Sequence, residues 1–381
     1  MSAPSFVLIA GETSGDLLGA DLMTALAARF PGARFAGVCG PRMQAAGCEP
    51  LAQIDELSLF GIAEVLLHLP RLFRLRARLF REILALKPAA VIGIDAPSFN
   101  LGLEWKLRRA GLKTVHYVSP TIWAWRQKRV HGIKQAVDLM LTLFPFEAAF
   151  YRQHQVPVRY VGHPLADVIP LQADRDAARL SLGLPSQGKL LALLPGSRGS
   201  EVSRLAPTFV ATARWLAQRE PQLRFVAPMA TPRLRAIFER ALLAAPELNA
   251  HLVDGQSHAV LAACDVALLA SGTAALEALL FGRPMVVTYR LAPFTHWLLR
   301  GVGLLKVQHV SLPNHLTTEP VVPELVQHDA VPEKLGPALL ELLHNPASAA
   351  RQTDAFVAAH QELRRNASAT AAAAIGELIG Q

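Results

Sequence analysis

The sequence predicts an α/β protein with two Rossmann-like domains whose parallel sheets face a central cleft. Short apolar runs alternate with longer helical patterns, which is typical of parallel sheets because each parallel connection needs a crossover. The alternation pauses once near the middle of the chain and then restarts. In addition, 381 residues exceed the roughly 250 to 300 at which single cores stop growing.

The expected strands are short runs rich in aliphatic and β-branched residues. They lie at residues 6–10, 35–39, 90–95, 114–118, 138–143 and 158–161 in the first half, and at 190–194, 223–227, 251–253, 266–270 and 285–288 in the second. Prolines and charges in residues 162–187 are typical of an interdomain linker. We therefore expect an N-terminal domain at 1–165, a C-terminal domain at 166–350, and a helical segment at 351–381 that packs across the domains or onto a partner subunit.

Composition limits the class of protein and its partners. Hydrophobic residues make up 51% and charged residues 18%, which is enough for two buried cores. The 38 lysines and arginines exceed the 30 acidic residues, so anionic partners are favoured. The start has no basic region of a secretory signal, and no apolar run reaches about 18 residues. We expect a cytoplasmic chain that does not span a membrane.

Cysteine and histidine show no metal-binding pattern. The three cysteines are unevenly spaced and the thirteen histidines are scattered. These spacings match neither a disulfide framework nor a zinc motif, and the cysteines are expected to be small buried residues. We predict no metal site and no cofactor.

Residues 57–86 depart from the alternation. A leucine-rich stretch leads into five arginines within residues 71–81, interleaved with apolar residues. A basic amphipathic helix of this kind is typical of contact with anionic lipid. The predicted membrane contacts are Leu66, Leu67, Leu69, Arg71, Leu72, Phe73 and Arg74. The alternative is a crossover helix with its apolar face in the core and solvated arginines. Nucleic acid is not expected, because no stacking aromatic residues alternate with the arginines.

Two strand-to-helix turns in the second half predict a nucleotide site. The turn after residues 190–194 and the turn after residues 266–270 both combine glycine with small polar residues. Such turns expose backbone amides at the positive end of a helix, which suits a pyrophosphate. Glu277 lies one helical turn further on, where a carboxylate can accept both ribose hydroxyls. The donor-binding candidates in these turns are Gly196, Ser197, Arg198, Ser271, Gly272 and Thr273.

Two turns in the first half predict the acceptor side of the site. Residues 11–16 are glycine-rich but fit neither dinucleotide nor P-loop patterns, and their acidic residues would repel phosphate. We assign Glu12, Ser14 and Gly15 to the acceptor or the donor sugar, with Glu12 a second catalytic candidate; the other acid of this turn can equally be a helix N-cap. Asp95 ends the strand at residues 90–95, where parallel sheets place ligand sites, and is the candidate base; Asn100 follows it in the same segment.

Taken together, these segments resemble the lipid-A-disaccharide synthase family, and the resemblance covers nearly the whole chain. The most specific strings are GIDAPSFN at residues 93–100 and YVSPTIWAWR at 117–126. Further matches are AGETSGD at 10–16, GHPL at 162–165, LPGSRGSE at 194–201, SGTAALE at 271–277, PMVVTYR at 284–290 and LPNHL at 312–316.

The resemblance implies a GT-B fold, with acceptor recognition in the first domain and UDP-sugar binding in the second. It implies an inverting transfer from UDP-2,3-diacylglucosamine to 2,3-diacylglucosamine 1-phosphate, giving a β-1,6-linked disaccharide 1-phosphate and UDP. Asp95 matches the family's base candidate, and Arg198, Glu277 and Asn314 match its important polar positions, with Asn314 presenting its amide to the donor. A peripheral protein on the inner face of the inner membrane, able to form homodimers through its C-terminal segment, is also implied.

Two other readings fit parts of the pattern. A different UDP-sugar enzyme of the same fold, such as a UDP-N-acetylglucosamine 2-epimerase or a peptidoglycan glycosyltransferase, would share the glycine turns and the ribose glutamate. Neither is expected to carry both specific strings. A non-catalytic lipid- or nucleotide-binding protein would keep the fold, but the presence of Asp95, Arg198 and Glu277 argues against it.

Overall fold

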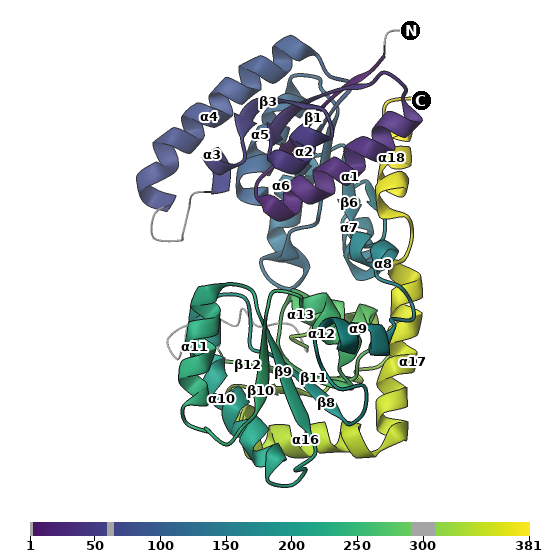
Figure 1. Ribbon diagram of the computed structural model, residues 1–381. Helices are drawn as coiled ribbons and strands as arrows, with labels where there is room; N and C mark the ends of the chain where they lie inside the picture. The colour runs from purple at the N-terminus through teal and green to yellow at the C-terminus, as the bar shows by residue number, and fades with distance from the viewer. Residues whose placement is uncertain (1–2, 59–64, 291–308) are drawn as a thin grey trace. The chain divides into compact units, whose positions relative to one another are not determined.

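The chain forms two compact units, each of which is described by itself. The computed structural model describes residues 3–58, 65–290 and 309–381 (Figure 1). The first unit comprises Met1–Asp167 and Leu363–Gln381, and the second comprises Val168–Glu362. The chain therefore passes between the units after residue 167 and again after residue 362, whereas the boundaries expected from the sequence were 165 and 350.

The first unit is built on a seven-stranded parallel sheet. Its strands are β1 (Ser5–Ala10), β2 (Arg34–Cys39), β3 (Cys48–Gln53), β4 (Ala90–Ile94), β5 (Thr114–Tyr117), β6 (Leu139–Thr142) and β7 (Val158–Tyr160). Their order is β3-β2-β1-β4-β5-β6-β7. The order reverses between β1 and β4, and open α/β sheets bind ligands beside the strand ends at such a point.

Helices connect and cover this sheet. They are α1 (Thr13–Arg29), α2 (Pro41–Ala45), α3 (Asp55–Ser58), α4 (Val65–Leu86), α5 (Pro97–Arg109), α6 (Val130–Ala136), α7 (Pro145–Gln153), α8 (Pro164–Val168) and the C-terminal α18 (Ala367–Leu378). Alanines of α18 and Ile375 are buried in one core cluster with Leu22 and Leu26 of α1, and Figure 1 shows the two helices side by side. The apolar face of the C-terminal segment is thus covered within its own chain.

The second unit repeats the architecture on a six-stranded parallel sheet. Its strands are β8 (Leu190–Leu194), β9 (Arg224–Met229), β10 (Ala250–Asp254), β11 (Val266–Ala270), β12 (Met285–Tyr289) and β13 (Glu324–Val326). Its helices include α9 (Arg175–Ser181), α10 (Gly199–Ala217), α11 (Pro232–Leu242), α12 (Ser257–Ala263), α13 (Thr273–Leu280), α15 (Leu312–Leu316), α16 (Pro332–His344) and α17 (Pro346–Leu363). The order β10-β9-β8-β11-β12-β13 reverses between β8 and β11.

The predicted linker is partly helical. Residues 162–187 contain α8 and α9, and Arg179 of α9 is only 1% exposed. Its guanidinium pairs with Asp265 at 2.9 Å and donates to the carbonyls of Ala263, Pro185, Ser186 and Gly188. This buried arginine ties the α9 part of the segment to the second unit, while the boundary between the two units, after residue 167, lies within the predicted linker.

The basic segment is a two-faced helix. On α4, Leu75, Leu79 and Ile83 are buried in a core cluster, as the crossover alternative expects. The side chain of Phe73 is 59% exposed, and Arg71, Arg74 and Arg81 are exposed as well. Of the predicted lipid contacts, Leu66, Leu67 and Leu69 lie in α4, but their side chains are outside the described part. No helix in the described ranges is both long and apolar enough to cross a membrane.

Candidate active site

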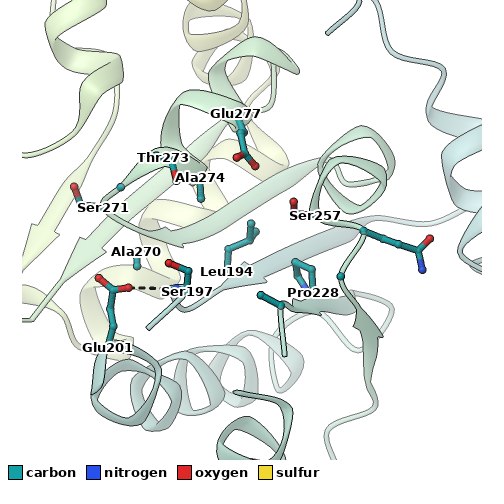
Figure 2. Close-up of a pocket in the computed structure, with 15 residues that line it drawn as sticks. Leu194, Ser197, Glu201, Pro228, Ser257, Ala270, Ser271, Thr273, Ala274 and Glu277 are labelled. Carbon is teal, nitrogen blue, oxygen red and sulfur yellow. Dashed lines mark hydrogen bonds between the residues drawn. The ribbon is translucent and has the colours of Figure 1, made fainter. Parts of the chain in front are cut away.

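A cavity in the second unit opens where its strand order reverses. It is lined by residues of the turns that follow β8, β9, β10 and β11, and by the start of α13 (Figure 2). Six of the eight predicted donor-binding residues line it: Gly196, Ser197, Ser271, Gly272, Thr273 and Glu277. The two glycine turns and Glu277, which the sequence predicted to share a site, thus lie around one cavity.

The turn after β8 depends on Gly196. Its φ of +124° lies in a region that favours glycine, and a Cβ at this position would lie 2.4 Å from Glu201 Oε2. The amide of Ser197 donates to the same carboxylate at 3.3 Å (Figure 2). In this structure Glu201 therefore accepts from a backbone amide that a phosphate oxygen could use at the N-terminus of α10.

The turn after β11 is held by its neighbours. The amide of Ser271 donates to the carbonyl of Thr288 at 3.1 Å, and its hydroxyl donates to the carbonyl of Val310 at 2.7 Å. Gly272 and Thr273, at the start of α13, are exposed. Their amides stand at a helix N-terminus whose partial positive charge favours an anion.

Glu277 lies on α13 and lines the same cavity with its side chain 19% exposed. Burial raises the pKa of its carboxyl, and His258 on α12, 3.7 Å away, opposes that increase. A partly desolvated carboxylate is a strong hydrogen-bond acceptor and can hold a vicinal diol.

The cavity also includes residues that sequence reasoning missed. Gly255, Gln256 and Ser257 follow β10 and line it, as do Pro228 near the end of β9 and Ala230 just after it. Gly255 and Gln256 both have left-handed backbones, with φ of +66° and +56°. A glycine directly after a strand of the same sheet was the available signal, because the carboxyl ends of parallel strands meet at one edge.

Two predicted donor residues lie outside this lining. Arg198 is the exposed N-cap residue of α10 and is not among the residues that line the cavity. Asn314 is 6% exposed and its amide is already used: the nitrogen donates to the Val322 carbonyl and to Glu324, and the oxygen accepts from the amides of Val321 and Val322. The expectation that Asn314 offers its amide to the donor is therefore wrong for this structure, because all of these hydrogen bonds go to residues 321–324.

The second candidate centre lies where the order of the first sheet reverses, between β1 and β4. Asp95 directly follows β4, is half-buried, and has a left-handed backbone with φ of +51°. Its amide donates to the carbonyl of Tyr117 at the end of β5. A carboxylate held at this edge by an unusual backbone is typical of a functional position.

Of the three site residues predicted in the turn after β1, two are exposed and one is buried. Glu12 and Ser14 are exposed, Glu12 as the N-cap residue of α1. Gly15 is buried, and a Cβ there would lie 3.4 Å from that of Ala10, so this glycine brings α1 close to the sheet rather than offering a ligand contact. Asp16 is 1% exposed and accepts from the amides of Gly40, Arg42 and Met43, at 2.8 to 3.1 Å. It caps α2 and is a structural residue.

Asn100 is also placed differently from the expectation. We predicted an acceptor-side contact, but its side chain is 0% exposed, on the inner face of α5. Its nitrogen donates to the carbonyls of Asp95, Ile9 and Ile94. In this structure Asn100 is therefore not exposed to a ligand and instead supports the backbone around Asp95.

Within the described ranges, no group of three or more histidine, cysteine, aspartate or glutamate residues could hold a metal ion. The cysteines Cys39, Cys48 and Cys264 are free and buried, and burial raises the pKa of each thiol. These thiols are therefore poor nucleophiles and act as core residues.

Comparison with known proteins decides between the candidate enzyme classes. The family model described as Lipid-A-disaccharide synthetase matches residues 6–375. The chain belongs to the lipid-A-disaccharide synthase family. Lipid-A-disaccharide synthase of Pseudomonas aeruginosa is 54% identical over 98% of this chain and 97% of its own length. That of Chromohalobacter salexigens is 53% identical over 98% and 96%.

Solved structures with the same architecture carry other activities. The calicheamicin glycosyltransferase CalG4 has a TM-score of 0.61 at 16% identity, with both chains covered completely. UDP-GlcNAc 2-epimerase from Neisseria meningitidis, bound to UDP-GlcNAc, has a TM-score of 0.60 at 11% identity, with 94% of this chain and 98% of that chain covered. These likenesses confirm the GT-B fold class, whereas the family identifies this chain as a glycosyltransferase of lipid A biosynthesis.

Proposed function

We propose that this lipid-A-disaccharide synthase transfers a diacylglucosamine from UDP-2,3-diacylglucosamine to 2,3-diacylglucosamine 1-phosphate. Family membership supports the reaction, and the cavity at the β8–β11 reversal supports the UDP site. The observation that carries the assignment is the convergence of two helix N-termini and Glu277 on one cavity. Backbone amides suit a diphosphate and a carboxylate suits a ribose.

The cavity has a volume of about 200 Å³ and is lined mainly by turn residues with exposed backbone groups. We assign it to the nucleotide diphosphate of the donor, because backbone amides and a carboxylate suit those groups.

The transfer requires a base and a stabilised leaving group. Asp95 removes the proton from the acceptor 6-hydroxyl as this oxygen attacks the anomeric carbon, and the bond from that carbon to the β-phosphate oxygen breaks with inversion. The amides at the starts of α10 and α13 stabilise the negative charge that develops on UDP. Arg198, exposed beside the first of these amides, is assigned to the same charge.

Membrane contact belongs to the same proposal. Both substrates carry acyl chains, so the protein must meet them at a lipid surface on the inner face of the inner membrane. Exposed Phe73, with Arg71 and Arg74 beside it on α4, supplies an apolar side chain and cations for that contact. A homodimer is the assembly that the family resemblance favours, and sedimentation over a range of concentrations tests it.

Product analysis tests the reaction. The enzyme in detergent is given UDP-2,3-diacylglucosamine with and without the acceptor, in the presence and absence of EDTA. We expect UDP and a disaccharide 1-phosphate, found by mass spectrometry, only when the acceptor is present, and at the same rate with EDTA. UDP release without acceptor, or an epimerised UDP-sugar, would contradict the assignment. Loss of activity in EDTA would show that a metal is required.

A further inference from the structure

We infer that Asn100 is a positioning residue that holds Asp95 in its reactive orientation from within the protein core. The inference rests on the proposed role of Asp95 as the base. The geometry that carries it is a set of three hydrogen bonds from one buried amide to the backbone on both sides of the sheet reversal.

The backbone at Asp95 needs support. Asp95 and Ala96 have consecutive left-handed conformations, with φ of +51° and +43°. Residues other than glycine are unfavourable there and persist only when their surroundings enforce the conformation. A Cβ on Gly11 would lie 2.2 Å from that of Ala96, so the turn after β1 also packs closely against this segment.

Asn100 supplies that support. Its Nδ2 donates to the carbonyl of Asp95 at 2.8 Å, to that of Ile9 at 3.2 Å and to that of Ile94 at 3.4 Å. Three carbonyl oxygens around one atom fix the orientation of the amide, because the opposite orientation would place its oxygen against all three. The side chain thus connects the carboxyl end of β4 to that of β1.

A buried pair fixes the helix that carries Asn100. Glu104, one turn further along α5, lies 2.8 Å from Nδ1 of His116 on β5, and both side chains are 0% exposed. A Cβ on Gly93 would lie 2.0 Å from Oε1 of Glu104 and 2.9 Å from Cβ of Asn100. The glycine of β4 therefore lets α5 approach the sheet, and the Glu104–His116 pair holds it there.

The replacement Asn100→Asp tests the inference, because it keeps the shape but replaces an amide that donates two hydrogens with a carboxyl that can donate at most one. We expect kcat to fall about 100-fold, as for a misplaced catalytic group, with KM for both substrates and the affinity for UDP unchanged. In the Asp95→Ala background, the same replacement is expected to cause no further loss. Such non-additivity is the signature of a residue that acts through Asp95.

The controls separate positioning from general stability. Leu107→Ala removes a buried side chain from the same helix without touching Asp95, and is expected to lower the Tm while kcat per folded molecule is retained. If Asn100→Asp does not fold, Asn100→Leu removes the donor in an apolar form and is measured in the same way. Unchanged kcat, or equal losses in the presence and absence of Asp95, would overturn the inference about Asn100 alone. Full activity of Asp95→Ala would instead overturn the base assignment, and the positioning role with it.

Discussion

At the scale of single residues, the donor site depends on where backbone amides point. Gly196 turns the chain after β8, and the amide of Ser197 that follows it donates to Glu201 at 3.3 Å. A phosphate that binds here must compete with a carboxylate for the same donor. On the proposed function, the affinity for UDP therefore depends on a conformation that only glycine adopts easily.

The replacement Gly196→Ala is expected to weaken UDP binding roughly tenfold or more, because misdirecting one amide removes a charge-assisted hydrogen bond worth about 1.5 to 3 kcal/mol. Calorimetric titration with UDP measures this. Gly183→Ala is the matched control: Gly183 also has a left-handed backbone, with φ of +66°, but a Cβ there would meet no atom within 4 Å. Equal UDP affinity in the two variants would show that the turn geometry is unimportant.

Residue roles were the least predictable part of the site. The local sequence predicted that Gly196, Ser271 and Glu277 share one site, and all three line one cavity, because turns at the carboxyl ends of neighbouring parallel strands lie at the same edge of the sheet. The roles predicted for Asn100 and Asn314 differ from the structure. An asparagine in a sequence gives no sign whether its side chain faces a ligand or bonds to the protein backbone. Only the three-dimensional partners distinguish the two cases.

At the scale of elements, α4 has one face in the core and one face exposed to solvent. Leu79 is 0% exposed in the core and Phe73 is 59% exposed, although both belong to the same arginine-rich stretch. The periodicity of the segment was compatible with either a core helix or a lipid-binding helix. The structure shows the core face directly, and lipid contact is our proposal for the opposite one.

The two faces predict opposite phenotypes. Leu79→Ala is expected to lower the free energy of unfolding by about 2 to 5 kcal/mol, because it leaves a cavity in the core. Phe73→Ser is expected to leave stability nearly unchanged but to reduce binding to phosphatidylglycerol vesicles in a flotation assay. Leu243→Ser serves as the control, since Leu243 is 77% exposed on the second unit. Equal loss of vesicle binding in Phe73→Ser and Leu243→Ser would contradict a specific role for α4.

The start of α7 predicts a pH effect on stability. Burial raises the pKa of Glu147 from 4.5 to about 8, although hydrogen bonds from Phe144, Leu143, Ser119 and Trp123 oppose the shift. The folded state then holds a proton that the unfolded state loses, so stability should fall as the pH rises from about 5 to about 8. Glu147→Gln, a neutral side chain of the same shape, should flatten the Tm over this range. A wild-type Tm that rises over the same interval would be inconsistent with a protonated Glu147.

Short edge strands limited the prediction of elements. The central strands are continuous apolar runs, such as residues 190–194, and the sequence located them closely. It missed β3, where three of the six residues are exposed, and β13, where all three are only half-buried. These two edge strands lack a continuous apolar pattern, because one side of the ladder and much of the surface of an edge strand meet water.

At the scale of the whole molecule, the two units have the same architecture but are assigned different parts of the reaction. Each sheet reverses its strand order once, and each reversal carries the residues assigned to the reaction. In the first unit these are Asp95 and its support, and in the second they are the helix starts and Glu277. On the proposed function, residues of the first unit therefore remove the proton and residues of the second unit bind UDP.

The rate of acceptor-dependent UDP release by Asp95→Ala, at saturating donor and acceptor, tests this separation most directly. We expect the rate to fall by roughly 100-fold or more, because general base catalysis typically contributes 10² to 10⁴, while UDP affinity stays at the wild-type value. A wild-type rate would show that Asp95 is not the base. A low rate accompanied by lost UDP affinity would show that proton removal and nucleotide binding are not divided between the two units.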